Sequence, residues 1–325
     1  MTPNKKIRNL LFVTQKVDEN DQLLGFSLEW LRRLTGQFEN IIVLCLEKGN
    51  YSLPDNITVI SLGKDRNIPR LLWFFNFYKN LWTRRKNYDA AFVFMNAIWV
   101  VAGAWLWWIL QKKVFLWYAH KTITWKHRLA EKFADGIFTS TSEGFRIKSK
   151  KIKIVGQGID TDLFKPGIYH ESSSSLRILS VGRIAPIKNC KALLDAAAAL
   201  NAQEIDFFLT IIGEPVFAQD VEYENLLKKI VSETGLVSKV SFLGKVPHKN
   251  LPAFYNSHHI FVNLGKTGSL DKTILEAMAS GCVVLSSNDS AKKFLPPQLI
   301  VESEDPNDLA EQIKDSARLN IGNEL

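Results

Sequence analysis

The sequence predicts an α/β protein with two domains, each built on a parallel sheet, and three observations favour this class. Short apolar runs alternate with helix-length segments along the chain, which is typical of parallel sheets covered by helices. The 325 residues are enough for two domains that each have a core. Residues 260–285 form a complete unit of strand, small-residue loop, helix and strand.

Seven strands are expected in the first half of the chain, with helices between most of them. The apolar runs lie at residues 9–14, 41–46, 57–62, 91–95, 114–117, 136–139 and 152–155. The N-terminal apolar run is too short for a secretory signal, so it is interpreted as the first strand. Residues 68–85 are rich in Trp and Phe, carry basic residues at their ends, and predict a helix.

The second half repeats this alternation. Strands are expected at residues 178–181, 207–212, 240–243, 260–263 and 282–285, and helices at 191–200, 223–234, up to Phe254, 271–280 and 308–317. Asn189 is expected to cap the first of these helices, and Gly281 to end the fourth in the left-handed conformation. The turn at 156–160, the LFKPG segment and the serines at 172–175 indicate a linker, so we expect domains at 1–168 and 169–325.

Residues 90–110 are apolar over a length that suggests a transmembrane helix. Asn96 interrupts the segment and leaves residues 97–110, which are fewer than the roughly 20 residues of a membrane span. Three interpretations stay open: a core helix partly exposed at a membrane interface, a fully buried helix, and a span. Four tryptophans within the segment favour the first, because indole prefers the headgroup level.

Positive charge is concentrated in the first half of the chain. Residues 1–165 hold 26 Lys and Arg against 14 Asp and Glu, whereas the remainder holds 15 against 19. This charge favours either a solvated basic face or, together with the aromatic helix, an anionic membrane surface. Nucleic acid is the weaker alternative, because no known nucleic-acid motif accompanies the charge, and we expect no nucleic-acid partner.

The cysteines and histidines predict no metal or disulfide chemistry. Cys45, Cys190 and Cys282 are far apart and odd in number, which indicates reduced packing residues of a cytosolic protein. The sequence has no Cys/His cluster with metal-ligand spacing and no nucleophile elbow. We therefore expect no essential metal and no cofactor.

Two segments predict a site for a diphosphate. The small-residue loop before the helix at 271–280 offers backbone N–H groups and the positive end of the helix dipole, and Glu276 could accept hydrogen bonds from a sugar diol. Arg183 and Lys188 follow the strand at 178–181, at the edge where open sheets bind ligands. Two cations there could neutralise a diphosphate leaving group without metal.

The same segments resemble glycosyltransferase family 4, the retaining GT-B glycosyltransferases that use nucleotide-diphosphate sugars. The matching motifs are VGRIAPIKN at 181–189, LEAMASG at 275–281 followed by VVLSS, GQGID at 156–160 with Phe164, and WYAH at 117–120. The resemblance implies two Rossmann-like domains facing a central cleft, the first for the acceptor and the membrane and the second for the nucleotide sugar.

The resemblance also implies roles for particular residues. Catalysis would involve His120, Arg183, Lys188 and Glu276, with His120 approaching the donor sugar from the first domain. Donor binding would involve Arg183, Lys188, Gly268, Ser269, Leu270, Asp271, Lys272, Thr273 and Glu276. Five of these residues have structural alternatives: Arg183 could cap a helix or pair with a carboxylate, Lys188 could be an ordinary exposed lysine, Glu276 a solvated helix residue, His120 a structural histidine, and Asp271 a helix cap.

Two departures from the family pattern leave the donor sugar and the acceptor open. The family usually carries a glutamate eight positions before Glu276, where this chain has Gly268. Either Asp271 and Lys272 take over sugar or phosphate contacts, or the donor sugar is recognised differently. Many members have a Gly-Gly pair after the first strand, where this chain offers Gly25 as an acceptor-side contact. The acidic residues at 18, 19 and 21 could hold an acceptor hydroxyl or merely solvate the loop.

These observations predict a cytoplasmic, peripherally membrane-bound glycosyltransferase. It would move a sugar from a UDP- or GDP-sugar to a lipid-linked or polysaccharide acceptor with retention and without an essential metal. Two alternatives stay open: an epimerase or hydrolase of nucleotide sugars on the same fold, and a catalytically silent sugar-nucleotide-binding subunit.

Overall fold

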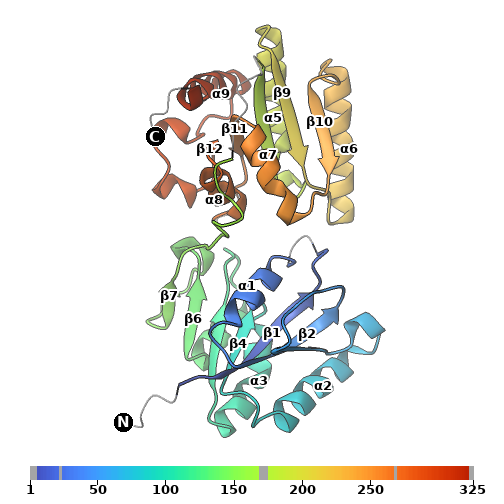
Figure 1. Cartoon of the computed structure of the whole chain (residues 1–325), viewed down its shortest axis with the longest axis vertical. Helices are drawn as coiled ribbons and strands as arrows, with labels where there is room; N and C mark the ends of the chain where they lie inside the picture. The colour runs from blue at the N-terminus through green and yellow to red at the C-terminus, as the bar shows by residue number, and fades with distance from the viewer. Residues whose placement is uncertain (1–5, 22–23, 168–174, 267–268, 322–325) are drawn as a thin grey trace. The chain divides into compact units, whose positions relative to one another are not determined.

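The chain folds into two compact units, residues 1–156 and 157–325 (Figure 1). The computed structural model describes residues 6–21, 24–167, 175–266 and 269–321. The division lies upstream of the expected boundary at 168/169, because Phe164 is buried in the core of the second unit beside Tyr255 and Ile274. Each unit has its own sheet and its own hydrophobic core.

The described part of the first unit is a seven-stranded parallel sheet with four α-helices. The strands lie side by side in the order β3-β2-β1-β4-β5-β6-β7. Their bounds are β1 Asn9–Val17, β2 Asn40–Lys48, β3 Ile57–Ser61, β4 Ala90–Phe94, β5 Lys113–Trp117, β6 Gly136–Thr139 and β7 Ile152–Ile154. The helices are α1 Ser27–Leu34, α2 Arg70–Thr83, α3 Ile98–Ile109 and α4 Trp125–Phe133.

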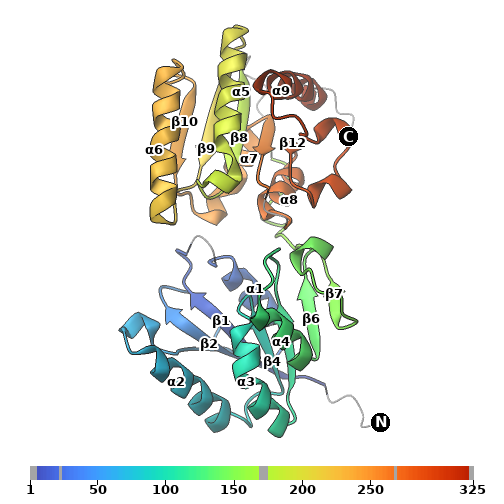
Figure 2. The same ribbon diagram turned by 180° about the vertical axis from the view of Figure 1, so that it is seen from behind.

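Helices cover both faces of this sheet. On one face, Leu28 of α1 packs with Phe12 of β1; on the other, Phe77 of α2 and Trp99 of α3 pack with Val13 of β1. Figures 1 and 2 show these two faces in turn, with α1 in front in the first and α3 and α4 in front in the second. The central strands are therefore buried on both sides, which explains their continuous apolar sequence.

The described part of the second unit is a five-stranded parallel sheet with five α-helices. Its strand order is β10-β9-β8-β11-β12. The strands are β8 Leu176–Val181, β9 Phe207–Ile212, β10 Val240–Gly244, β11 Ile260–Asn263 and β12 Val283–Ser286. The helices are α5 Cys190–Ala202, α6 Ala218–Glu233, α7 Leu251–Ser257, α8 Lys272–Ala279 and α9 Pro306–Ile321.

The second sheet is also covered on both faces. Helices α5, α6 and α9 pack on one face, and α7 and α8 pack on the other. Chain connections run from β8 to one side of the sheet and from β11 to the other, so the strand order reverses between these two strands. Open α/β sheets bind ligands at the carboxyl ends of strands beside such a point.

Several expectations about single elements need correction. Asn189 does not cap α5 with its side chain; it lies in the left-handed conformation with φ 52°, directly after the 3-10 turn Pro186–Lys188. The last helix begins earlier and ends later than expected, at Pro306–Ile321. Its residues Leu309 and Ile313 are buried in the core of the second unit.

The apolar segment at 90–110 divides into β4 and the twelve-residue helix α3. Within the ranges that the structure describes, no helix combines the length and the apolar character needed to cross a bilayer. Trp99 and Trp107 of α3 are buried, whereas Trp105 and Trp108 are exposed. Helix α3 is thus a core helix with one exposed aromatic side.

Candidate active site

The loops after β8 and β9 meet backbone to backbone at the carboxyl edge of the second sheet. The Gly182 N–H donates to the Ile212 carbonyl at 2.9 Å, and Gly213 lies in the left-handed region with φ +137°. A Cβ on Gly213 would lie 1.9 Å from the carbonyl oxygen of Gly182, so only glycine fits there. This close approach fixes the start of the loop that carries Arg183 and Lys188.

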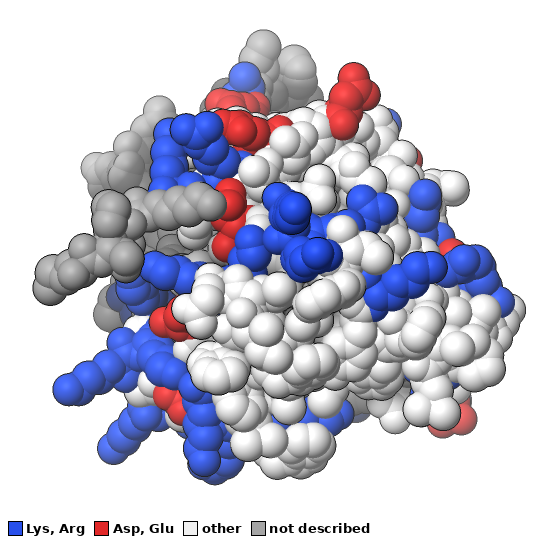
Figure 3. Space-filling view, turned by 90° about the horizontal axis from the view of Figure 1, so that it is seen from below, with Lys and Arg blue, Asp and Glu red and all other residues white. Residues whose placement is uncertain are grey.

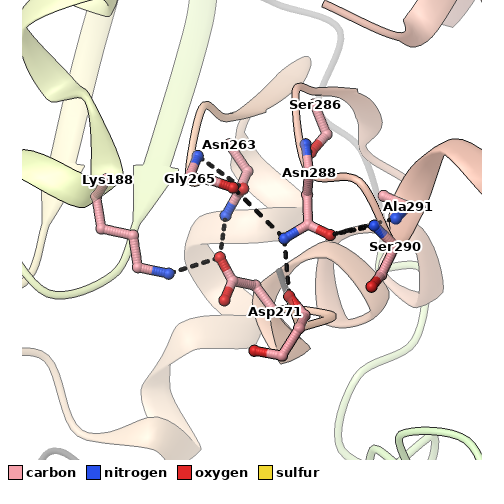
Figure 4. Close-up of polar contacts among 9 residues, drawn as sticks. Lys188, Asn263, Gly265, Asp271, Ser286, Asn288, Ser290 and Ala291 are labelled. Atoms are coloured by element: carbon pink, nitrogen blue, oxygen red, sulfur yellow. Dashed lines mark hydrogen bonds and ion pairs between the residues drawn. The ribbon is translucent and has the colours of Figure 1, made fainter. Parts of the chain in front are cut away.

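Lys188 and Asp271 join the loops that follow β8 and β11. The Nζ atom of Lys188 lies 2.6 Å from Oδ2 of Asp271, and both side chains are mostly buried (Figure 4). Asn263, the last residue of β11, donates through Nδ2 to the same oxygen at 3.0 Å. The two predicted donor-binding residues are therefore in direct contact at the point where the strand order reverses.

Asp271 is more than a helix cap. It stands at the N-cap position of α8, yet its side chain makes no cap hydrogen bond to the helix. A Cβ on Gly265 would lie 3.2 Å from both Oδ2 of Asp271 and Cδ of Lys188. A larger residue at 265 would press on the ion pair, so the small residue keeps space for it.

Asn288 contacts Ser269, which lies shortly before α8. Its Nδ2 donates to the Ser269 carbonyl at 2.9 Å, and its Oδ1 accepts the N–H groups of Ser290 and Ala291 at 3.0 and 3.2 Å (Figure 4). Asn288 is fully buried. One side chain thus connects the loop after β12 to the loop that precedes α8.

Glu276 of α8 belongs to a second polar cluster, which it forms with His248 and Tyr255. Its Oε1 lies 2.9 Å from Nε2 of His248, and its Oε2 accepts the hydroxyl of Tyr255 at 3.2 Å. Only 3% of Glu276 is exposed, so it is not the solvated helix residue that one interpretation allowed. Burial, followed by the charge of Glu276, raises the pKa of Tyr255 well above its usual value. The hydroxyl therefore stays protonated and holds the carboxylate in place.

Lys272, the first residue of α8, is a partly buried cation. Burial lowers the pKa of its ammonium group to about 8, and the nearby carboxylate of Glu276 opposes that shift. A negative ligand beside this ammonium group would favour its charged form, and the two charges would attract each other strongly. Lys272 also lies at the positive end of the α8 dipole.

Arg183 points toward α6. Its Nε lies 3.8 Å from Oδ2 of the buried Asp220, and its guanidinium lies over the ring of Phe217, 5.3 Å from the ring centre. Arg183 therefore pairs with a carboxylate, which is one of the structural alternatives considered from the sequence. At 3.8 Å the pair is long for a hydrogen bond, and the Arg183 side chain is about a quarter exposed (26%), so it is accessible to a ligand.

His120 lies in the first unit, after β5. Its backbone N–H donates to the Gly144 carbonyl at 2.8 Å, and its Nδ1 accepts the N–H of Thr122 at 3.1 Å. Partial burial and the charge of Lys121 lower the pKa of the imidazole. The ring is therefore neutral at neutral pH, and because Nδ1 is an acceptor, its proton sits on Nε2.

Gly25 lies in a tightly folded loop after β1. A Cβ on Gly25 would lie 2.5 Å from the carbonyl oxygen of Asp21. Lys16 bridges Asp18 and Asp21, with 3.2 Å to each carboxylate. Burial lowers the pKa of Lys16, but hydrogen bonds to Asp21 and Asp18 outweigh it and raise the pKa above its usual range. Two of the three acidic residues considered for the acceptor thus stabilise the loop through this lysine.

Sequence reasoning missed several members of these clusters. Asn263 had a readable signal, because it is a polar residue at the end of a fully apolar strand. His248, Tyr255, Asp220 and Asn288 had none, because their partners come from other loops and helices. Gly268, which departs from the family pattern, lies outside the described residues. Among the residues that are described, no group of three His, Cys, Asp or Glu side chains is arranged to hold a metal ion.

Comparison with known proteins identifies the second unit. Residues 168–318 match the family described as Glycosyl transferases group 1. The chain is 30% identical over 150 residues to the mannosylfructose-phosphate synthase of Agrobacterium fabrum, a match that covers 43% of this chain and 33% of that protein. It is 26% identical over 148 residues to the lipopolysaccharide core biosynthesis mannosyltransferase LpsB of Rhizobium meliloti. This match covers 42% of this chain and 41% of that protein. The matched region is thus less than half of each curated relative.

The fold as a whole resembles a solved structure. The crystal structure of Anabaena Alr3699/HepE in complex with UDP and glucose superposes with a TM-score of 0.77 at 17% identity, covering 97% of this chain and 92% of that one. This similarity extends over both units, whereas the family match is confined to the second. Residues 168–318 thus match the glycosyl transferases group 1, and the two parallel-sheet units have the fold of the GT-B glycosyltransferases.

Proposed function

We propose that this protein is a retaining glycosyltransferase that moves a sugar from a UDP- or GDP-sugar to a lipid-linked or polysaccharide acceptor. The observation that carries the proposal is the contact of Lys188, Asn263 and Asp271 at the carboxyl ends of β8 and β11, within the group 1 domain. The solved structure of HepE contains UDP and glucose, and LpsB is named for lipopolysaccharide core biosynthesis. Both support the same substrate class here.

In this proposal, protein cations stabilise the departing diphosphate. Lys188, Lys272 and the N-terminus of α8 lie at one edge of the second sheet, and Arg183 would turn from Asp220 to join them. Charge that develops on the leaving group would meet positive groups that are already in place, which is the most effective form of electrostatic catalysis. Such a site needs no essential metal ion.

The other side chains would position the two parts of the donor. Glu276 would accept hydrogen bonds from the ribose hydroxyls, and its bonds to His248 and Tyr255 orient it for that role. His120 would donate its Nε2 proton to a hydroxyl of the donor sugar. Asp271 would contact the sugar or the phosphates in place of the glutamate that the family carries at the position of Gly268.

The acceptor side is proposed from the first unit. Gly25 would let the acceptor approach the loop after β1, and the protein would work at the cytoplasmic face of the cell membrane. The basic, aromatic first half supports an acceptor carried on lipid. Nucleic acid is not part of the proposal.

Donor consumption by the purified protein tests the proposed reaction. We expect turnover of one UDP- or GDP-sugar in the presence of acceptor, a product with the donor's anomeric configuration by NMR, and activity that survives EDTA. A protein that binds donor without turnover would be a silent binding subunit, and one that consumes donor without acceptor would be an epimerase or hydrolase. Activity lost with EDTA and restored by Mg²⁺ would contradict the metal-independent mechanism.

Calorimetry with UDP and GDP tests the proposed phosphate contacts. Lys188→Ala and Arg183→Ala should each weaken binding of the preferred nucleotide by about 1.5 to 3 kcal/mol, the range for hydrogen bonds to charged groups. Lys228→Ala, at an exposed lysine of α6, serves as the matched control. Unchanged affinity in either site variant would remove that residue from the diphosphate site.

A further inference from the structure

Helices α2 and α3 of the first unit expose a row of large apolar side chains. One side of each helix is anchored in the core through Phe77 and Trp107. The opposite sides leave seven large side chains between 46% and 83% exposed. These residues, named here the α2–α3 face, are Leu71, Leu72, Phe75, Trp82, Trp105, Trp108 and Ile109.

The exposed parts of the two helices adjoin each other. The ring centres of Tyr78 and Trp105 lie 5.6 Å apart, and the Tyr78 hydroxyl donates to the Ala102 carbonyl at 2.9 Å. Tyr78 therefore links the outer side of α2 to that of α3. The exposed apolar side chains of the two helices therefore lie on adjoining surfaces, and such an accumulation is unusual for surface that stays in water.

Positive charge surrounds this patch and negative charge is nearly missing from its sequence. Between Asp65 and Glu131 the chain contains a single acidic residue, Asp89. Its carboxylate accepts the backbone N–H groups of Arg8 and Asn9, at the opposite end of β4 from α3. The basic residues within or next to the two helices along the chain are Arg70, Lys79, Arg84, Arg85, Lys86, Lys112 and Lys113. Figure 3, seen from the side where α2 and α3 lie in Figure 1, shows a wide uncharged area bordered by Lys and Arg.

The guanidinium of Arg85 lies over the ring of Trp82, 4.6 Å from the ring centre. An aromatic ring and a cation thus share one position at the margin of the patch. Indole rings settle at the level of lipid headgroups, and Lys and Arg beside them attract anionic lipids. This pairing of side chains matches the chemistry of a bilayer surface.

A second copy of the chain fits the same face poorly. Two such faces would bring rows of Lys and Arg together with hardly any acidic partner, and like charges across an interface are unfavourable. Helix α3 has twelve residues, or roughly 18 Å at 1.5 Å per residue, so it cannot cross a bilayer. It can, however, lie flat in the interface with its aromatic side immersed.

We propose that the α2–α3 face docks the protein on an anionic phospholipid bilayer, with Trp82, Trp105 and Trp108 at headgroup level and the surrounding Lys and Arg on lipid phosphates. The inference deepens the proposed function by naming the surface that would hold the protein beside a lipid-linked acceptor. Docking itself requires neither donor nor acceptor. It can therefore be tested separately from catalysis.

Sedimentation with vesicles tests the docking face. The full chain should pellet with vesicles of phosphatidylglycerol and phosphatidylcholine, and release near 0.5 M NaCl, where the screening length falls below about 5 Å. The triple variant Leu71→Ser, Phe75→Ser, Trp108→Ser should bind at least about tenfold more weakly, because it removes three of the most exposed apolar side chains. Brominated lipids should quench tryptophan fluorescence in the wild type and less in the variant.

Matched controls make the test specific. The triple variant Leu226→Ser, Val237→Ser, Leu243→Ser removes exposed apolar side chains from the second unit and should bind vesicles like the wild type. Lys79→Glu with Lys113→Glu should weaken binding to anionic vesicles. Circular dichroism and UDP calorimetry verify that each variant is folded. The α2–α3 variant should bind UDP like the wild type.

Four outcomes would overturn the proposal. They are wild-type protein that stays in the supernatant, equal binding to pure phosphatidylcholine vesicles, equal loss in the control variant, and a wild-type dimer in light scattering that the α2–α3 variant abolishes. The last would assign the face to a second copy. If vesicle binding fails while UDP still binds, the docking face is wrong and the proposed function stands. If UDP binding fails while vesicle binding persists, the proposed function is wrong and the docking face stands.

Discussion

At the scale of single residues, the contact between Lys188 and Asp271 is the centre of the candidate site. The two side chains are 83 positions apart in sequence and 2.6 Å apart in space. Each could be selected from the sequence, because each follows an apolar strand. Their contact could not be predicted, because it depends on β11 lying next to β8. The local sequence pattern of a strand does not show which other strands it pairs with.

The partners of Glu276 were beyond sequence reasoning for a related reason. A glutamate with apolar neighbours in a helix indicates that a partner exists, but does not identify it. His248 comes from the turn before α7 and Tyr255 from α7 itself, and neither position differs in pattern from ordinary surface or core residues. Packing of α7 against α8 is what creates this cluster.

Asp271→Asn separates the two roles that Asp271 could have. Asparagine has the same size and is also a good N-cap residue, so the free energy of unfolding should change little. Loss of the charge beside Lys188 should lower turnover at least about tenfold, or about 1.4 kcal/mol in the barrier. Steady-state kinetics and urea unfolding measure both quantities. Wild-type turnover with normal stability would show that Asp271 does not take part in the reaction.

Lys272 predicts that nucleotide binding depends on pH. Because burial lowers its pKa to about 8, a bound diphosphate should raise that pKa and draw a proton from solution. UDP affinity should therefore fall above pH 8, by at most about tenfold per pH unit, and calorimetry near pH 8 should show proton uptake in buffers of different ionisation enthalpy. Lys272→Gln should abolish the uptake. Proton uptake that persists in this variant would assign it to another group.

At the scale of elements, helix and strand positions in the sheets were largely predictable, and ends were less so. Continuous apolar runs bounded by Gly or polar residues marked β8, β9 and β11 correctly. Helix α9 was placed too short, because its first turn begins with Pro306, a residue that favours the start of a helix. The segment at 90–110 was ambiguous because a buried strand followed by a core helix has the same apolar composition as a membrane span.

His258 connects α7 to the second sheet and predicts an acid sensitivity of that element. Its Nε2 lies 2.9 Å from the Thr210 hydroxyl of β9 and its Nδ1 lies 2.7 Å from the Phe254 carbonyl. Burial lowers the pKa of this imidazole to about 4. The unfolded chain binds the proton near pH 6.5, so stability should fall between about pH 6.5 and 4, by up to about 3 kcal/mol from this residue.

Urea unfolding at pH 7.5 and pH 4.5 measures this effect. His258→Gln should be less stable than the wild type at pH 7.5 but should lose less stability on acidification. All other residues are the same in both proteins, so their contribution to the pH dependence cancels in the comparison. An identical pH dependence in wild type and variant would mean that His258 is not the acid-sensitive group.

At the scale of the whole molecule, the two units share a strand order that could not be predicted from the sequence. In the first unit the order β3-β2-β1-β4-β5 precedes two further strands, and in the second the order is β10-β9-β8-β11-β12. The same order thus occurs twice, although no repeat is evident in the sequence. Alternating strands and helices predicted the class of fold, whereas the strand order depends on which strands pair in space, and no single segment encodes that pairing.

Separate cores predict that the second unit is autonomous. A fragment of residues 157–325 should fold cooperatively, because its buried residues pack among themselves. It should bind UDP within about threefold of the full chain, since the proposed nucleotide contacts all lie in it, and it should have no transferase activity, since His120 is missing. Circular dichroism and calorimetry test this. An unfolded fragment would show that the units depend on each other.

The ion pair between Lys188 and Asp271 also bears on the end of the reaction cycle. If the diphosphate binds Lys188 as proposed, it would compete with the carboxylate of Asp271 for the same ammonium group. Asp271 would stay near the lysine, because both residues belong to one sheet edge, and its carboxylate could bind the ammonium group again after the sugar has been transferred. Recapture would speed the departure of the nucleotide product, so the residue that lowers affinity for UDP would also keep the enzyme from being trapped by it.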